Sequence, residues 1–226
     1  MKKISPSILN VNPNHFVEYV NQLIKWGVSN VHYDVMDKIF VPNDALQLSE
    51  IKEIKNSCLP HIMDIHLMVK DVKKYYSMYK NVGDILTFHY EVLDNDLFNW
   101  IIREAKKDNI KIGIAINPET SILEVFNFIK EKIHDVSLVL IMSVHPGKGG
   151  QKFIDDSLQK VSFIKNEFNK MNIRNIIIQI DGGINDLTIK KSFDAGVDLA
   201  VVGSYLVKNF SKNVIDNLLS SDLLEK

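Results

Sequence analysis

Two histidines and two aspartates lie at the ends of short apolar runs, where they could share one site. His32 and Asp34 are two residues apart in the run 30–35, and alternate residues of a β-strand face the same side. His66 lies near the end of a second run, and Asp181 directly follows a later one. Two imidazoles with two carboxylates suit Zn²⁺, Fe²⁺, Mn²⁺ or Co²⁺. If the carboxyl ends of these strands converge, the sequence predicts a site for one divalent metal.

Asp34 and Asp181 also suggest acid–base chemistry. Two carboxylates on either side of a metal could serve opposite faces of a planar carbon, one removing a proton and the other returning one. The metal would stabilise the enediolate formed between the two steps. The alternative is a two-metal hydrolase site, which usually has more carboxylates and a bridging ligand.

Three late runs end in glycine-containing turns, at 147–150, 182–183 and 203–204. Barrel enzymes commonly bind phosphate after their last strands, where backbone amides meet the anion. The turns therefore predict a phosphate site, and the alternative is that these glycines only allow tight turns.

The elements that position these residues alternate along the chain. Eight short β-branched runs predict strands buried on both faces, and amphipathic stretches with helical spacing lie between them. Asn12 and Asp155 precede the first and sixth stretches as candidate caps. The predicted strands are 4–9, 30–35, 62–67, 85–89, 110–116, 137–142, 176–180 and 199–202. Eight strand–helix units favour a (β/α)8 barrel, a TIM barrel of the α/β class, as a single catalytic domain over 1–226. A doubly wound open sheet is the alternative, but the turn 7–11 after the first run lacks the glycines of a dinucleotide site.

Composition narrows the function classes. The 27 basic and 28 acidic side chains give a net charge of −1, which argues against binding to nucleic acid or to an anionic membrane. Cys58 is the only cysteine, which excludes an intrachain disulfide framework and favours a reducing, cytoplasmic location. No run is long enough for a signal peptide or a membrane span, so we expect neither.

The chain closely resembles the ribulose-phosphate 3-epimerase family. The similar segments occur in order at the predicted strand ends, at 5–9, 32–37, 40–43, 64–69, 87–91, 142–147, 149–153, 181–184 and 202–204. The resemblance implies a ribulose-phosphate-binding barrel that interconverts D-ribulose 5-phosphate and D-xylulose 5-phosphate at carbon 3, in the pentose phosphate pathway. It also implies a sugar-phosphate substrate and a homo-oligomer, dimer or hexamer.

Carried over by position, the resemblance also implies residue roles. His32, Asp34, His66 and Asp181 correspond to ligands of one divalent cation, with Asp34 as proton acceptor and Asp181 as proton donor in one direction. Met36, Met68 and Met142 correspond to a thioether lining around the enediolate. The predicted substrate-binding residues are Ser7, His66, Gly147, Lys148, Gly149, Gly150, Asp181, Gly182, Gly183, Gly203 and Ser204.

Two positions depart from the family pattern. Lys38 stands where a glycine is usual, which would cost about 1 kcal/mol if the position needs a positive φ, and we expect the loop to adapt its path. Lys148 replaces an aromatic residue that helps close the site in the family. We expect Lys148 to hold or cover the substrate phosphate, and a solvated loop lysine is the alternative.

Three other functions compete. An allulose-6-phosphate 3-epimerase would share the metal ligands, although the turns 147–150 and 181–183 look more like those of the pentose enzyme. A non-catalytic phosphate-binding barrel is disfavoured because both Asp34 and Asp181 are present. A sugar-phosphate isomerase or decarboxylase without a histidine pair is disfavoured by His32 and His66.

Overall fold

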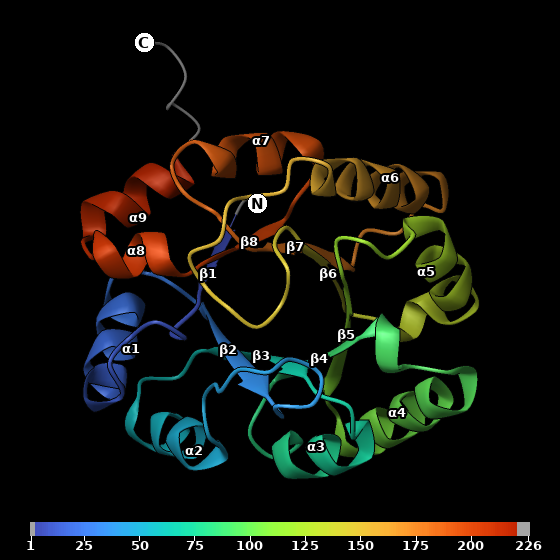
Figure 1. Ribbon diagram of the computed structural model, residues 1–226, viewed down its shortest axis with the longest axis horizontal. Coiled ribbons are helices and arrows are strands. Elements are labelled where there is room, and N and C mark those ends of the chain that lie inside the picture. The colour runs from blue at the N-terminus through green and yellow to red at the C-terminus, as the bar shows by residue number, and fades with distance from the viewer. Residues whose placement is uncertain (1–2, 221–226) are drawn as a thin grey trace.

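Eight parallel strands form the centre of the protein, and the helices surround them (Figure 1). The computed structural model describes residues 3–220. Neighbouring strands follow the order β1-β8-β7-β6-β5-β4-β3-β2, and a parallel bridge between Ser7 and His32 closes the ring between β1 and β2. The strands are β1 Lys3–Pro6, β2 Asn30–Met36, β3 Ile62–Met68, β4 Ile85–His89, β5 Lys111–Ile116, β6 Leu138–Met142, β7 Ile177–Asp181 and β8 Leu199–Val202. The predicted (β/α)8 barrel is confirmed.

The helices cover the outer face of the sheet with apolar stripes. Helix α4, for example, buries Phe98, Ile101, Ile102 and Ala105, and its first turn is capped by Asp94, which accepts a hydrogen bond from the amide of Leu97. The α-helices are α1 Phe16–Lys25, α2 Leu48–Ser57, α3 Val72–Tyr79, α4 Asn95–Asp108, α5 Ile122–Ile129, α6 Ser157–Lys170, α7 Thr188–Ala195, α8 Ser204–Lys208 and α9 Lys212–Leu219. Short 3-10 helices occur at η1 Pro13–His15, η2 Tyr90–Val92 and η3 Lys130–Asp135.

The interior of the barrel has an apolar side and a polar side. Ile85, Ala115, Leu138 and Leu140 pack together at inward positions of β4, β5 and β6. On β1, β2, β3, β4 and β7 the same alternation places fully buried polar side chains inside, namely Ser5, His32, Asp64, His66, Thr87, His89 and Gln179. Buried polar groups need partners, so the sequence of these strands requires a connected network there.

Three sequence expectations differ from the structure in detail. The first strand ends at Pro6 rather than residue 9, because Ser7 makes only the closing bridge to β2. Asp155 does not cap α6: the residue before that helix is Asp156, and Asp155 pairs instead with Lys191 on α7. The five-residue α8 carries no repeating apolar stripe and was not expected, so the predicted eighth stretch at 214–219 belongs to α9.

The barrel extends from β1 to α9 within the described residues. The expectation of a single domain over 1–226 includes residues 1–2 and 221–226, which lie outside them, and it stays a prediction. Among residues 3–220, no helix combines the length and the apolar character that a membrane crossing requires.

Candidate metal centre and active site

Four side chains meet at the carboxyl ends of β2, β3 and β7. His32 and Asp34 point inward from β2, and Asp34 pairs in register with His66 on β3. Asp34 Oδ1 lies 3.4 Å from His32 Nε2 and 3.3 Å from His66 Nδ1. Asp181 Oδ2, at the end of β7, lies 3.9 Å and 3.8 Å from the same two nitrogens. One ligand atom of each of the four residues is within 4.8 Å of all the others, so the structure brings the predicted cluster together.

The geometry fits a divalent transition metal. His32 is fully buried, and its Nε2 has no hydrogen-bond partner among the described residues although it faces both carboxylates. A buried nitrogen without a partner is costly, and a cation between the four groups would satisfy it. Two imidazole nitrogens and two carboxylate oxygens are a ligand set that Zn²⁺, Fe²⁺, Mn²⁺ and Co²⁺ accept. This buried His/Asp cluster is therefore able to bind a metal ion.

Asp64 fixes the orientation of His32. Its Oδ2 lies 2.8 Å from His32 Nδ1 and also accepts hydrogen bonds from Ser5 and Gln179. Because an ionised carboxylate only accepts, Asp64 holds a proton on His32 Nδ1, and Nε2 is the nitrogen directed at the cluster. Asp64 and Gln179 were not among the predicted site residues. The available signal was their position, two residues before His66 and Asp181 on the same inward faces.

The two catalytic candidates have opposite electrostatic environments. Burial would raise the pKa of Asp34, but the positive charge of His32 and the hydrogen bond of His66 hold it well below its usual range. Burial and the negative charge of Asp34 together raise the pKa of Asp181 to about 7. Burial would lower the pKa of His32, but Asp64 and Asp34 raise it well above the ordinary value. In the protein alone, Asp34 is ionised at neutral pH and Asp181 can carry a proton.

Ser7 supports Asp34 from the neighbouring strand end. Its hydroxyl donates to Asp34 Oδ2 at 2.7 Å, and its oxygen accepts from the amide of Leu9 at 3.3 Å. Asp34 therefore directs Oδ1 to the histidines while Oδ2 is held by Ser7. A substrate contact of Ser7 itself stays a prediction.

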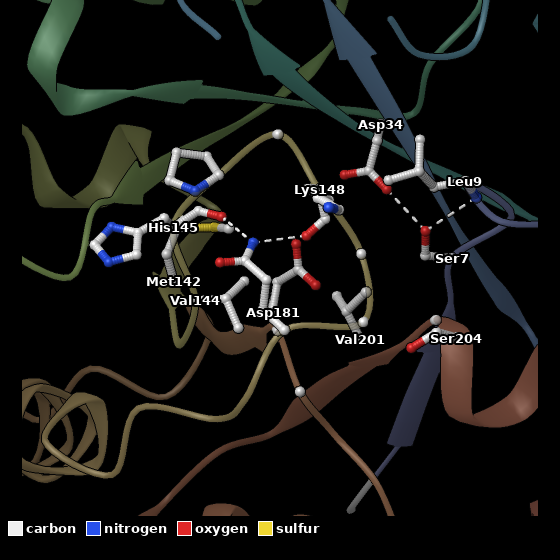
Figure 2. Close-up of a pocket in the computed structure, with 18 of the residues that line it drawn as sticks. Ser7, Leu9, Asp34, Met142, Val144, His145, Lys148, Asp181, Val201 and Ser204 are labelled. Carbon is white, nitrogen blue, oxygen red and sulfur yellow. Dashed lines mark hydrogen bonds between the residues drawn. The ribbon is translucent and has the colours of Figure 1, made fainter. Parts of the chain in front are cut away.

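One pocket lies above this cluster and collects the predicted glycine turns (Figure 2). The carboxylates of Asp34 and Asp181 enter it from β2 and β7, and Lys148 lies on the loop after β6. The predicted residues that line the pocket are Ser7, Asp34, Met36, Met68, Met142, Gly147, Lys148, Gly149, Gly150, Asp181, Gly182, Gly183, Gly203 and Ser204. His32 and His66 are not among the lining residues, because both are fully buried beneath it.

The turn after β7 requires its two glycines. Gly182 has φ +120°, and a Cβ there would lie 2.4 Å from the side chain of Val144. Gly183 has φ +64°, and a Cβ there would lie 2.7 Å from the backbone nitrogen of Phe153. Both positions combine a left-handed backbone with close contact to the loop after β6. These two loops consequently pack against each other at one side of the pocket.

The structure bears differently on Lys38 and Lys148, the two positions that depart from the family pattern. Lys38 has φ +61°, so the position does need a left-handed backbone, and the loop does not adapt its path as expected: the lysine adopts the strained conformation. Lys148 has an exposed side chain, and its carbonyl accepts a hydrogen bond from Gln151. Its predicted role at the phosphate stays a prediction.

Comparison with known proteins places these features in a family. The model of the ribulose-phosphate 3 epimerase family matches residues 3–207. The ribulose-phosphate 3-epimerase of Bacillus subtilis is 32% identical over 90% of this chain and 91% of its own length. The enzyme of the same name from Escherichia coli K12 is 31% identical over 96% of this chain and 94% of its own.

Solved structures with low sequence identity show the same fold. A 3-hexulose-6-phosphate synthase matches with a TM-score of 0.67 and 15% identity, covering 96% of this chain and 97% of that one. The orotidine 5'-monophosphate decarboxylase of Sulfolobus solfataricus matches with a TM-score of 0.69 and 8% identity, covering 96% of each chain. At these identities the likeness establishes the barrel alone.

Proposed function

Because the chain belongs to the ribulose-phosphate 3-epimerase family, and is therefore an epimerase, we propose that it interconverts D-ribulose 5-phosphate and D-xylulose 5-phosphate by a two-base mechanism. One observation carries the mechanism: Asp34 and Asp181 reach the same buried histidine pair from different strands, and both line the pocket. That arrangement suits the removal of a proton from one face of carbon 3 and its return to the other.

Each side chain of the cluster has a distinct role in this mechanism. Asp34 is ionised and held by Ser7, so it accepts the carbon-bound proton. Asp181, whose pKa burial and Asp34 raise, donates a proton from the opposite face, and the roles exchange in the reverse direction. His32, Asp34, His66 and Asp181 would hold one divalent cation, which when bound would stabilise the negative charge of the enediolate oxygens.

Two further groups complete the proposed site. Met36, Met68 and Met142 line the pocket with apolar thioethers, which exclude water around the reacting carbon. The loops containing Gly147–Gly150, Gly182–Gly183 and Gly203–Ser204 bind the phosphate, because glycines let backbone amides approach an anion closely. Turnover in the cytoplasm within the pentose phosphate pathway, by a dimer or hexamer, belongs to the same proposal and rests on the family resemblance.

Two assays test the proposal. The Co²⁺-loaded protein should epimerise ribulose 5-phosphate with a higher kcat/KM than allulose 6-phosphate, and a preference for the hexulose would make it the sister epimerase. Metal analysis should find about one ion per chain in the wild type, and His32→Ala with His66→Ala should abolish binding because two of four ligands are lost. A fully loaded and active double variant would exclude the metal site.

A further inference from the structure

Two side chains, His89 and the part-buried Glu91, form a hydrogen-bonded row behind His66, on the side away from the pocket. His66 Nε2 lies 2.8 Å from His89 Nε2, at the end of β4. His89 Nδ1 lies 3.1 Å from Glu91 Oε2. Both histidines are fully buried, and their rings lie nearly parallel with centroids 4.9 Å apart. Neither His89 nor Glu91 lines the pocket, so direct contact with substrate does not explain them.

The hydrogen bonds in this row determine where each proton lies. An ionised carboxylate only accepts, so Glu91 requires a proton on His89 Nδ1. His66 Nδ1 faces Asp34 and Asp181, and in the proposed metal-bound state it needs a free lone pair to bind the cation. His66 then carries its proton on Nε2 and donates it to His89 Nε2. His89 accepts there and donates from Nδ1 to Glu91 Oε2, so the carboxylate matches the order of protons that metal binding by His66 requires.

The two rings are shielded from water. Both are fully buried, and Phe40 covers His89, with ring centroids 4.5 Å apart. Water cannot take over the hydrogen bonds of either ring, so the choice between the two nitrogens of His89 depends on its two partners.

Glu91 is well placed to set that choice. Burial would raise its pKa, but hydrogen bonds from His89, the Thr120 hydroxyl and the Asn117 amide outweigh burial and bring it to about 2. The Asn117 amide donates to Oε1 at 2.9 Å, which leaves Oε2 for His89. Lys160 donates to the carbonyls of Asn117, Pro118 and Thr120 at 2.6–2.8 Å and so anchors the loop that holds Glu91.

We propose that Glu91 acts through His89 as a positioning residue, holding His66 in the tautomer whose Nδ1 is free to bind the metal. The inference rests on the metal-ligand role proposed above for His66. It gives the two ligand histidines matching support: Asp64 orients His32 directly, whereas Glu91 orients His66 through one intervening ring.

The first test uses the Zn²⁺-loaded wild-type protein. Long-range ¹H–¹⁵N NMR spectra distinguish a protonated from an unprotonated ring nitrogen. His66 should carry its proton on Nε2, and His89 on Nδ1 only. A proton on Nε2 of His89 would overturn the proposal, and this measurement requires no variant and no activity.

The second test measures Co²⁺ affinity by competition with a chelator. Glu91→Gln presents a neutral amide that can also donate, so the order of protons is no longer imposed. Its Kd for Co²⁺ should rise about 10–100-fold, with kcat recovering at saturating metal. Glu124→Gln, at an exposed position of α5, makes the same chemical change and should bind like the wild type. A Glu91→Gln protein with wild-type Co²⁺ affinity would overturn the proposal.

Thr120→Val separates positioning from support of the loop. It removes one hydrogen bond to Glu91 but leaves the carboxylate on His89, so it should lower stability and keep the affinity for Co²⁺. An equal loss of affinity in Thr120→Val and Glu91→Gln would reduce Glu91 to a structural role. If Glu91→Gln does not fold, Thr120→Val and the wild-type spectra decide. A wild-type protein that binds neither Zn²⁺ nor Co²⁺ would instead refute the metal role in the proposed function.

Discussion

Asp34 and Asp181 have the same side chain but different surroundings. Asp34 has two imidazoles nearby and accepts a hydrogen bond from Ser7, whereas Asp181 lies farther from the histidines and has the charge of Asp34 beside it. In the proposed mechanism one is poised to accept a proton and the other to give one. The difference between them arises from the packing of β1, β2 and β7, which residue spacing alone does not reveal.

Asp34→Asn and Asp181→Asn should each slow epimerisation strongly. The amide keeps the size of the side chain but removes the basic carboxylate, and loss of a general acid or base typically costs about 10²–10⁴-fold. Turnover should be measured with saturating Co²⁺ and with a metal count for each variant, since both residues are also proposed ligands.

Asp216→Asn is the matched control, because Asp216 is exposed on α9 and pairs only with Lys212 among the described residues. It should retain wild-type turnover. Near-normal turnover of Asp34→Asn or Asp181→Asn with metal bound would contradict the two-base assignment.

Lys38→Gly should stabilise the protein or leave its stability unchanged. A lysine at φ +61° costs about 1 kcal/mol that a glycine avoids. Its exposed ion pair with Asp44, at 2.7 Å, is worth about 0–1 kcal/mol and is lost in the variant. Urea unfolding should be compared with that of Lys38→Ala, which loses the ion pair but keeps the strained backbone. If the Lys38→Gly protein is less stable than the Lys38→Ala protein, the backbone strain at Lys38 does not contribute significantly to stability.

Lys148→Ala should raise KM several-fold with a smaller effect on kcat. The side chain is exposed on a pocket-lining loop, and an ammonium closing on a dianionic phosphate contributes a charge-assisted hydrogen bond. Steady-state kinetics at two ionic strengths check this, because substrate capture should also become less sensitive to salt. Unchanged KM and unchanged salt dependence would make Lys148 a solvated loop residue.

At the scale of elements, the strands were easier to predict than the short helices and helix caps. Runs such as 138–142 and 199–202 are apolar on both faces, as in strands of a parallel sheet that is covered on both sides, so their positions were clear from the sequence. The five-residue α8 is shorter than two helical turns and has no periodicity to detect. The cap at α6 was misplaced because Asp155 and Asp156 are adjacent and either could precede the helix.

Gly183→Ala should destabilise the loop pair after β6 and β7 more than Gly150→Ala does. Both glycines have positive φ, so each alanine carries about 1 kcal/mol of backbone strain. At Gly183 the new Cβ also meets the backbone of Phe153, and such overpacking typically adds about 1–3 kcal/mol. At Gly150 nothing among the described residues lies within 4 Å of the new Cβ. Urea unfolding of the two variants measures the difference, and equal losses would show that the close contact is unimportant.

At the scale of the whole molecule, the polar interior connects distant parts of the chain. Gln179 on β7 donates to Asp64 on β3, which holds His32 on β2. The alternation of side chains along each strand places all three residues at inward positions. It did not predict their partners, because the partners depend on the relative heights of strands more than 100 residues apart in sequence. The metal ligands were found because histidines and aspartates are typical metal-binding residues, whereas glutamine is not.

Four buried tyrosines should make the protein unstable in alkali. Burial raises the pKa of Tyr19, Tyr33, Tyr76 and Tyr79 above the ordinary value of 10.0. A phenol whose pKa is raised by folding stays protonated in the native state, while the unfolded chain releases its proton above about pH 10. Stability is therefore full below about pH 10 and falls as the pH rises further, because the unfolded state then binds fewer protons. Urea midpoints measured from about pH 8 upward, together with tyrosinate absorbance, should show unfolding and ionisation occurring together.

Two tyrosine-to-phenylalanine changes should act in opposite directions at neutral pH. The Tyr19 hydroxyl is buried without a hydrogen-bond partner among residues 3–220, and its ring stacks on Phe210 at 4.1 Å, so Tyr19→Phe removes an unsatisfied group and keeps the packing. It should raise stability by up to about 1–3 kcal/mol. The Tyr76 hydroxyl donates to Asp108 at 2.8 Å, so Tyr76→Phe should lower stability because this hydrogen bond is lost. The stability of both variants should fall less steeply with rising pH than that of the wild type, because each variant lacks one phenol that releases its proton on unfolding. A Tyr19→Phe protein that is less stable at neutral pH, or as sensitive to alkali as the wild type, would contradict this account of the buried phenol.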